Sequence, residues 1–421
     1  MEKLVVDGGV SLKGTVEVSG SKNSLLPILA ATLLTREKCV IRNAPDLRDT
    51  VSMLKILKYL GSNYEFKDHV ITIKPNGAQR TEAPYKLVST MRASFCVLGP
   101  LLSRYKNAKV SLPGGCVIGV RPVDLHLKGL AKLGAKIQVK EGYVYARTKH
   151  LKGDNIYLGG PFGSSVLATG NVMMAATLAR GTTIIESAAC EPEVVDLARF
   201  LIKMGARIKG EGSPTIEIKG VKELRGADYE IIPDRIEAAT LVMAAAITRS
   251  EVFVKKAQAG HMTAVLEKLK DVGVNIKVAR DGILVKKSSR KFKPFDIVTL
   301  PYPGFPTDCQ AQFMTLMSIT EGISVITEKI YPDRFMHVAE LNRMGAEIKR
   351  EGPYAVVHGI RALSGAPVMA SDLRASAGLV LAGLVAKGRT EISRIYHLDR
   401  GYENLDLKLK SLGARIERAK E

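Results

Sequence analysis

The sequence predicts an α/β protein built from six repeats of about 70 residues. Three observations support this: a helix–glycine–strand signature that recurs along the chain, an apolar helix in every repeat, and strands joined by short turns. At 421 residues the chain is too long for one ordinary hydrophobic core. We therefore expect two domains with three repeats in each.

The repeat signature is an amphipathic helix that ends in a glycine and runs into a strand, as in KLGAKIQV and SLGARIER. Glycine directly after the last helical turn is the usual C-terminal cap, because it takes a positive φ readily. The signature glycines lie about 70 residues apart and are Gly61, Gly134, Gly205, Gly273, Gly345 and Gly413. Each is expected to end a helix.

A second helix in each repeat is apolar nearly all round and rich in Ala, Gly and Ser, which predicts burial on every side. These segments are residues 23–34, 93–104, 170–180, 237–249, 311–320 and 375–387. Strands rich in β-branched residues follow them, as in TTIIES. Hairpins such as KIQVKEGYVYART have short turns and are antiparallel, which excludes a purely parallel sheet. A solenoid is the other reading of any repeat, but this period is too long for the common solenoids.

Composition favours a soluble cytoplasmic protein. No apolar run is long enough to cross a membrane, and residues 1–9 do not read as a signal peptide. Five cysteines without a CxxC pair argue against disulfides and zinc. The net charge of +20 suggests an anionic partner. Because the basic residues are dispersed, small anionic substrates are favoured over nucleic acid.

The stretch from Leu112 to His126 carries a thiol, Cys116, in a glycine-rich loop. Arg121 follows, and Pro122 with Asp124 predicts the start of a helix. The glycines Gly114, Gly115 and Gly119 allow positive φ and close approach of a ligand. A thiol beside a guanidinium and a helix N-terminus is expected to be acidic. A tight turn with a buried structural cysteine remains the alternative.

Polar residues also gather where the two kinds of helix begin, and helix N-termini bind phosphate and carboxylate groups. At the apolar helices they are Lys22, Asn23, Arg92, Ser164, Ser165, Asp234, Arg235, Asp308, Asp372 and Arg374. At the amphipathic helices they are Asp46, Arg48, Arg121, Asp124, Glu191, Asp333, Arg334, Asp399 and Arg400. These positions predict an anion-binding cleft. Helix caps and surface ion pairs are the alternative for each residue taken singly.

Several motifs resemble the UDP-N-acetylglucosamine branch of the enolpyruvyl transferase family, over essentially the whole length. They are SGSKNS, MRAS, PGGCVIGVRPVDLH, EPEVVD, IIPDRIEAAT, FPTDCQAQ, DRFMHVAEL, SDLRASAGLVLAG and LDRGYE. The resemblance implies two inside-out α/β barrels of three repeats each. One domain would span residues 22–232, and the other would join residues 1–21 to residues 233–421.

The resemblance also implies an activity of the EC 2.5.1.7 type. Phosphoenolpyruvate would give its enolpyruvyl group to the 3′-hydroxyl of UDP-N-acetylglucosamine, with release of phosphate, in the first committed step of peptidoglycan synthesis. It implies no metal or organic cofactor, and it identifies the epoxide fosfomycin as an inhibitor. From the sequence as a whole we also expect a cytoplasmic monomer without a nucleic-acid or membrane partner.

Site residues follow from the matching motif positions. The resemblance makes Cys116 the proton donor and the site of a covalent phosphoenolpyruvate adduct, and Asp308 the proton acceptor. An N-cap formed by Asp308 with Thr307 remains open. Lys22, Arg121 and Arg400 match the phosphate-binding residues, and Lys22 and Arg400 count with the catalytic set. The remaining phosphoenolpyruvate contacts are Asn23, Arg334 and Arg374, with Asp372 expected to pair with one of the two arginines. The nucleotide-sugar contacts are Asn23, Arg92, Arg121, Pro122, Val123, Asp124, Leu125, Ser165, Val166, Asp308 and Ile330.

Two positions depart from the family pattern. The family's Lys-x-Ser-Val-Gly stretch reads Gly163-Ser164-Ser165-Val166-Leu167, so the lysine that would contact the diphosphate is missing. Tyr331 stands where phenylalanine is common.

Three other functions remain to be weighed. A transferase that makes enolpyruvylshikimate phosphate shares the fold but lacks the cysteine loop. A non-catalytic relative would be expected to lose Lys22, Cys116 or Arg400, all of which are present. A nucleic-acid-binding protein would be revealed by salt-dependent binding.

Overall fold

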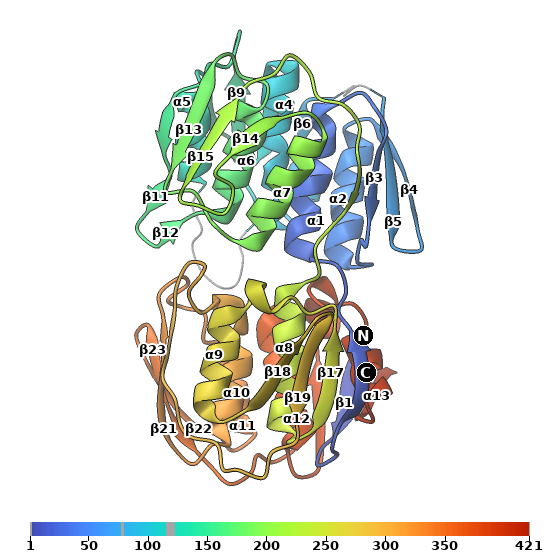
Figure 1. Ribbon diagram of the computed structural model, residues 1–421, viewed down its shortest axis with the longest axis vertical. Coiled ribbons are helices and arrows are strands. Elements are labelled where there is room, and N and C mark those ends of the chain that lie inside the picture. Colours follow the sequence, from blue (N-terminus) through green and yellow to red (C-terminus); the bar gives the residue numbers. More distant parts are fainter. Residues whose placement is uncertain (1, 77–79, 115–122, 421) are drawn as a thin grey trace. The chain divides into compact units, whose positions relative to one another are not determined.

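The computed structural model describes residues 2–76, 80–114 and 123–420. Within these ranges the chain divides into two compact units (Figure 1). One unit comprises residues 20–114 and 123–232, and the other comprises residues 2–19 and 233–420. We call them the middle unit and the terminal unit.

The middle unit contains three four-stranded sheets among its described residues, in the orders β16-β3-β5-β4, β6-β7-β9-β8 and β10-β13-β15-β14. Its strands are β3 (Cys39–Arg42), β4 (Ser62–Lys67), β5 (Val70–Pro75), β6 (Glu82–Ala83), β7 (Asn107–Ser111), β8 (Lys136–Lys140), β9 (Tyr143–Arg147), β10 (Asn155–Tyr157), β13 (Thr182–Glu186), β14 (Arg207–Lys209), β15 (Thr215–Lys219) and β16 (Asp228–Glu230). A small hairpin joins β11 (Gly159–Gly160) to β12 (Gly163–Ser164).

The terminal unit repeats this plan in the orders β18-β19-β17-β2, β20-β21-β23-β22 and β24-β25-β1-β26. Its strands are β1 (Glu2–Asp7), β2 (Lys13–Glu17), β17 (Glu251–Lys255), β18 (Asn275–Ala279), β19 (Gly282–Lys286), β20 (Ile297–Thr299), β21 (Gly322–Glu328), β22 (Glu347–Glu351), β23 (Tyr354–Gly359), β24 (Pro367–Met369), β25 (Arg389–Ser393) and β26 (Arg415–Lys420). Every four-stranded sheet described has one parallel pair at one edge and two antiparallel pairs.

Strands from the start of the chain complete two sheets of the terminal unit. β1 lies between β25 and β26 and is antiparallel to both, as the contact of the blue and red segments in Figure 1 shows. β2 pairs in parallel with β17. In the middle unit the last strand, β16, likewise returns to pair in parallel with the first, β3.

The apolar helices form the interior of each unit, as predicted. In the middle unit they are α1 (Lys22–Ala31) with the 3₁₀ turn η1 (Thr32–Leu34), the 3₁₀ helix η2 (Arg92–Val97) with α4 (Leu98–Tyr105), and α6 (Val166–Ala176). In the terminal unit they are α8 (Arg235–Ile247), α10 (Gln310–Ser318) and α12 (Leu373–Val385). The helices of each set contact one another, and most of their residues are buried. The segment 93–104 differs from expectation because it is 3₁₀ up to Val97, and α4 then begins with Pro100 in its first turn.

The amphipathic helices lie beside the sheets. They are α2 (Arg48–Tyr59), α5 (Asp124–Lys132), α7 (Pro192–Lys203), α9 (Thr263–Val272), α11 (His337–Arg343) and α13 (Leu405–Ser411). Each is followed by its signature glycine, and all six glycines have φ between 90° and 104°. The amide of Ala206 donates to the carbonyl of Leu201 over 2.9 Å, the bond expected of a Schellman cap. The predicted C-terminal caps are therefore confirmed.

The remaining short helices are α3 (Tyr85–Val88), η3 (Ala259–His261), η4 (Thr307–Cys309) and η5 (Ile395–Arg400). Across the described parts of the chain, every helix is too short or too polar to cross a bilayer.

Candidate active site

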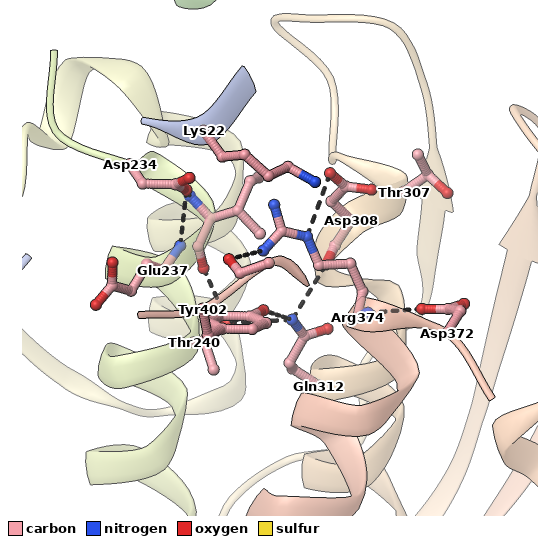
Figure 2. Close-up of polar contacts among 12 residues, drawn as sticks. Lys22, Asp234, Glu237, Thr240, Thr307, Asp308, Gln312, Asp372, Arg374 and Tyr402 are labelled. Atoms are coloured by element: carbon pink, nitrogen blue, oxygen red, sulfur yellow. Dashed lines mark hydrogen bonds and ion pairs between the residues drawn. The ribbon is translucent and has the colours of Figure 1, made fainter. Parts of the chain in front are cut away.

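Asp308 lies in η4, directly before the apolar helix α10, and two arginines, Arg334 and Arg374, hold its carboxylate. Figure 2 labels Asp308 and Arg374 of this group. Nη1 of Arg334 donates to Oδ1 over 2.7 Å, and Nε of Arg374 lies 3.5 Å from Oδ2. Both guanidiniums are almost fully buried, whereas about a quarter of the Asp308 side chain, 26%, is exposed. The structure thus brings three predicted site residues together around one partly accessible carboxylate.

Asp372 is the second carboxylate of this cluster. Its Oδ2 lies 3.6 Å from Nε of Arg334, which confirms the predicted pairing with one of the two arginines. It also caps α12 by accepting from the amides of Arg374 and Ala375 over 2.6 and 2.8 Å. Burial alone would lower the pKa of Arg334, but Asp308 and Asp372 outweigh it and raise that pKa. Arg334 therefore stays charged.

Arg374 sits over the ring of Tyr402, with its Cζ 4.9 Å from the ring centroid. Its Nη1 donates to the carbonyl of Gly401 over 3.4 Å, and Nη2 has no hydrogen-bond partner among the described residues. The hydroxyl of Tyr402 is bonded in turn to Thr240 and Gln312 (Figure 2). Sequence reasoning missed these three buried polar residues. The only signal is that Thr240 and Gln312 interrupt apolar helices and that Tyr402 lies within the motif LDRGYE.

Helix caps explain some of the predicted polar positions but not Asp308. Asp234, Asp372 and Ser165 are N-caps whose side chains accept backbone amides. The N-cap positions of η4 and α10 are Pro306 and Cys309, without a side-chain bond, and Thr307 donates to Glu328 over 2.8 Å. The N-cap alternative for Asp308 with Thr307 is therefore wrong, because Asp308 lies inside the 3₁₀ turn and its carboxylate faces the arginines.

In the middle unit, Lys22 is the first residue of α1, and its side chain is buried. Nζ lies 3.4 Å from Oδ2 of Asp49, a buried carboxylate in the first turn of α2. Sequence reasoning missed Asp49, although it stands in the polar start LRD of that helix. The pair keeps a cation at the N-terminus of α1.

Asn23 and Val166, both predicted nucleotide-sugar contacts, line one pocket of the middle unit. The pocket lies between α1, α6 and α7 and is otherwise lined by Pro27, Cys96, Leu167, Gly170, Glu193, Val194 and Leu197. Next to Val166, Ser165 caps α6 by accepting the amide of Ala168 over 3.3 Å. The structure therefore brings Asn23 and the start of α6 together.

The helix predicted from Pro122 and Asp124 is confirmed, since α5 begins at Asp124 with Val123 at its N-cap position. Leu125 packs near the β11–β12 hairpin, because a Cβ on Gly160 would lie 3.1 Å from its Cδ1. His126 is buried beside Phe95 and lies 3.0 Å from Nδ2 of Asn171. Burial and the charge of Arg92 lower the pKa of His126 to about 3. Arg92 is the first residue of η2, and its charge therefore acts on the buried His126 of α5.

Cys116, Arg121 and Pro122 lie outside the described residues, as do Gly115 and Gly119. Gly114 is described and does not have a positive φ. A Cβ at this position would lie 2.4 Å from the carbonyl oxygen of Ser89, so glycine is needed there for close packing.

Two further predicted site residues, Arg400 and Ile330, lie on the terminal unit. Arg400 is the last residue of η5. The amides of Ile330 and Tyr331 donate to Oε1 of Glu328 over 2.9 and 3.0 Å. Tyr331 also places its ring near the guanidinium of Arg334, 5.9 Å from Cζ to centroid.

The described cysteines are poor acids. Burial raises the pKa of Cys39 to about 11 and those of Cys96 and Cys309 to about 12, and it also raises the pKa of Cys190. Each of these four thiols stays protonated near neutral pH.

Comparison with known proteins identifies the family. The sequence profile of EPSP synthase (3-phosphoshikimate 1-carboxyvinyltransferase) matches residues 6–409. The UDP-N-acetylglucosamine 1-carboxyvinyltransferase of Methylacidiphilum infernorum is 56% identical over 418 residues, covering 99% of each chain. The enzyme of that name from Nitratidesulfovibrio vulgaris is 53% identical over 421 residues, covering 100% of each chain.

Solved structures share the fold. The enolpyruvyl transferase NikO from Streptomyces tendae matches with a TM-score of 0.90 at 25% identity, covering 100% of this chain and 99% of that one. An EPSP synthase from Acinetobacter baumannii matches with a TM-score of 0.74 at 20% identity, covering 100% of both chains. The predicted α/β fold of six repeats is confirmed as the enolpyruvyl transferase fold. The chain belongs to the enolpyruvyl transferase family, in the group of the UDP-N-acetylglucosamine 1-carboxyvinyltransferases.

Proposed function

We propose that this protein transfers the enolpyruvyl group of phosphoenolpyruvate to the 3′-hydroxyl of UDP-N-acetylglucosamine, releasing phosphate. The observation that carries the proposal is the identity of 51–56% over nearly the whole chain with enzymes of that name. The alternative acceptor, shikimate 3-phosphate, is less well supported, because the EPSP synthases with the same fold are only 20–21% identical.

The reaction is an addition followed by an elimination. In the addition, C3 of phosphoenolpyruvate gains a proton, and the sugar oxygen forms a bond to C2 while its hydroxyl loses a proton. In the elimination, the bond from C2 to the phosphate oxygen breaks and C3 loses a proton, which restores the double bond. The protein must therefore supply one proton donor, one proton acceptor and cations for the phosphate and carboxylate groups.

Cys116 is the proton donor in this proposal, and the same sulfur can add covalently to phosphoenolpyruvate. Asp308 accepts the hydroxyl proton. The contacts of Asp308 support that role, since two buried guanidiniums and the N-terminus of α10 favour a charged carboxylate that is still partly exposed.

Substrate binding falls to the cations at the helix starts. Lys22, Arg121 and Arg400 bind the phosphate of phosphoenolpyruvate, with Asn23, Arg334 and Arg374 as further contacts. The burial of Lys22, Arg334 and Arg374 supports this assignment, because buried cations attract anions more strongly than exposed ones. UDP-N-acetylglucosamine is bound by Asn23, Arg92, Asp308, Ile330, residues 121–125, Ser165 and Val166.

The setting of the enzyme is part of the same proposal. The middle and terminal units act as its two domains, for which the expected bounds are 22–232 and 1–21 with 233–421, and both substrates are small molecules of the cytoplasm. The protein works as a monomer without metal, organic cofactor, nucleic acid or membrane, in the first committed step of peptidoglycan synthesis.

A phosphate-release assay tests the proposal. Purified protein is incubated with phosphoenolpyruvate and either UDP-N-acetylglucosamine or shikimate 3-phosphate. We expect phosphate release with the nucleotide sugar, together with a product heavier by the enolpyruvyl group. Release with shikimate 3-phosphate alone, or with neither acceptor, would overturn the proposal.

A further inference from the structure

Arg400 lies between two neighbours that are each held firmly within the terminal unit. Asp399 precedes it and is bound by Arg418 of β26. Gly401 and Tyr402 follow it and pack against the start of α12 and the apolar helices. We propose that Arg418 and Tyr402 are positioning residues that fix the backbone of Arg400 from both sides, so that its guanidinium meets the phosphate of phosphoenolpyruvate. This inference rests on the proposed function of Arg400.

On one side, the guanidinium of Arg418 binds two carboxylates at once. Its Nη2 and Nη1 donate to Asp399 over 2.7 and 3.2 Å, and its Nε and Nη2 donate to Asp406 over 3.0 Å each. Glu2 of β1 adds a third carboxylate at 3.5 Å. Paired bonds from one planar fork fix orientation as well as distance, which a lysine cannot do. Arg418 therefore ties η5 and the first turn of α13 to the edge strand β26.

On the other side of Arg400, Tyr402 is fully buried, and its hydroxyl group forms hydrogen bonds with other buried polar side chains. It lies 2.9 Å from Oγ1 of Thr240 and accepts from Nε2 of Gln312 over 3.0 Å. Gln312 also donates to the backbone carbonyl of Asp308 over 3.1 Å. The cluster links α8, α10 and the segment that follows Arg400, and Arg374 lies on the ring of Tyr402 (Figure 2).

Gly401 completes the restraint on this side. A Cβ there would lie 2.4 Å from Cδ1 of Leu373, so the backbone lies directly against the start of α12. The carbonyl of Gly401 accepts from Arg374, and its amide donates to Leu398 over 2.9 Å. The residues flanking Arg400 consequently have little freedom to shift.

The composition of the buried cluster argues for positioning rather than for stability alone. Burying polar groups costs free energy unless each is bonded, and apolar side chains would fill the same space without that cost. Oε1 of Gln312 is buried without a hydrogen-bond partner among the residues the structure describes. Because hydrogen bonds are directional, this cluster fixes the orientation of Tyr402, which apolar contacts alone would not do.

The test measures binding of phosphoenolpyruvate by calorimetry, and turnover by phosphate release, in full-length Arg418→Lys and Tyr402→Phe. The matched control is Arg389→Lys, since Arg389 of β25 binds Asp7 on the same sheet with two bonds of 3.1 and 3.3 Å. We expect each test variant to weaken phosphoenolpyruvate binding about tenfold, the loss typical of one charge-assisted contact. Binding of UDP-N-acetylglucosamine should stay within about twofold, and the control should match the wild type in both measurements.

Double variants show whether the effect passes through Arg400. In an Arg400→Lys background, Arg418→Lys or Tyr402→Phe should weaken phosphoenolpyruvate binding less than about twofold further, because the group being positioned is already gone. Additive losses, equal losses for both substrates, or a wild type that does not bind phosphoenolpyruvate would overturn the inference. Tyr402→Phe keeps the packing, so it decides the matter if Arg418→Lys fails to fold. A wild type that binds phosphoenolpyruvate through Arg400 but does not use UDP-N-acetylglucosamine would refute the proposed function and leave the positioning role supported.

Discussion

Nη1 of Arg334 lies 2.7 Å from Oδ1 of Asp308, and the arginine side chain is 4% exposed while the aspartate side chain is 26% exposed. The other oxygen of the same carboxylate faces Arg374. Both oxygens of Asp308 are thus held from the protein side while part of the group stays accessible. Such a carboxylate cannot rotate freely, which suits a base that must meet one hydroxyl in one direction.

Replacing the proposed base Asp308 should slow catalysis without unfolding the protein. We expect Asp308→Asn to lower kcat by roughly 10²–10⁴-fold, the usual contribution of a positioned acid or base. The amide keeps the volume of the side chain but removes the charge that pairs with two buried guanidiniums, so the thermal unfolding midpoint should fall while the protein stays folded. Asp333→Asn is the control, because Asp333 is exposed and pairs with Arg350 at the surface. Phosphate release by Asp308→Asn within threefold of the wild type would exclude the proposed role.

The buried His126 should make the protein sensitive to acid. Burial and Arg92 lower its pKa from 6.5 to about 3, so the folded state resists a proton that the unfolded chain accepts. The stability is fully present above pH 6.5 and is lost as the pH falls toward 3. Between pH 7 and pH 4, His126→Gln should remove roughly 3 kcal/mol of this pH dependence. Urea unfolding of both proteins between pH 7 and 4 measures it, and parallel curves would contradict the assignment.

The buried Glu237 of α8 should make the protein less stable as the pH rises, which is opposite to the effect of His126. Burial raises its pKa from 4.5 to about 7, although Lys408 lowers it in part. The contribution of this group to stability is therefore full below pH 4.5 and is lost as the pH rises through about 7. As the pH rises, the free energy of unfolding of the wild type should therefore fall by roughly 3 kcal/mol more than that of Glu237→Gln. The measurement is urea unfolding at pH 5 and pH 8, and a larger pH dependence in the variant would show that the sign is wrong.

The sequence predicted those parts of the fold that depend on patterns within a single helix or strand. The signature glycines and the apolar segments follow from helix geometry alone, and the structure confirms both kinds of helix. The pairing of β1 with β25 and β26 joins residues nearly 400 apart in the sequence, as in the register of Leu4 with Ile392. Nothing in a strand sequence identifies a partner at that distance.

The candidate site was predictable residue by residue but not as a cluster. Asp308, Arg334 and Arg374 stand at the starts of different elements, and only the packing of those elements places both arginines on one carboxylate. Thr240 and Gln312 were missed for a related reason. A polar residue in an apolar helix has the same pattern whether it faces a partner or is simply tolerated, so its bonds appear only in the folded state.

Gly163 should be hard to replace by the lysine of the family pattern. It has a φ of 93° in the β11–β12 hairpin, a conformation that costs an L-residue roughly 1 to 2 kcal/mol. We expect Gly163→Ala and Gly163→Lys to lose similar stability, which separates strain from charge. Against the alanine variant, the lysine should lower the KM for UDP-N-acetylglucosamine by up to about fivefold, the effect of one partly exposed charge pair. Equal KM values would mean that another cation already contacts the diphosphate.

Cys116 should be replaceable by another acid but not by an apolar residue. Cys116→Ala is expected to lower kcat by roughly 10²–10⁴-fold, because the proton for C3 of phosphoenolpyruvate then has no donor. Cys116→Asp should retain substantial turnover with an optimum at lower pH, since a carboxylic acid of similar reach can give the same proton. Both variants should resist epoxide alkylation, which requires a reactive thiolate.

Cys309 is the internal control: it adjoins Asp308, but burial raises its pKa to about 12, so Cys309→Ala should stay active and remain sensitive to the epoxide. Near-normal phosphate release by Cys116→Ala, or inactivation through modification of Cys309 alone, would exclude Cys116 as the proton donor.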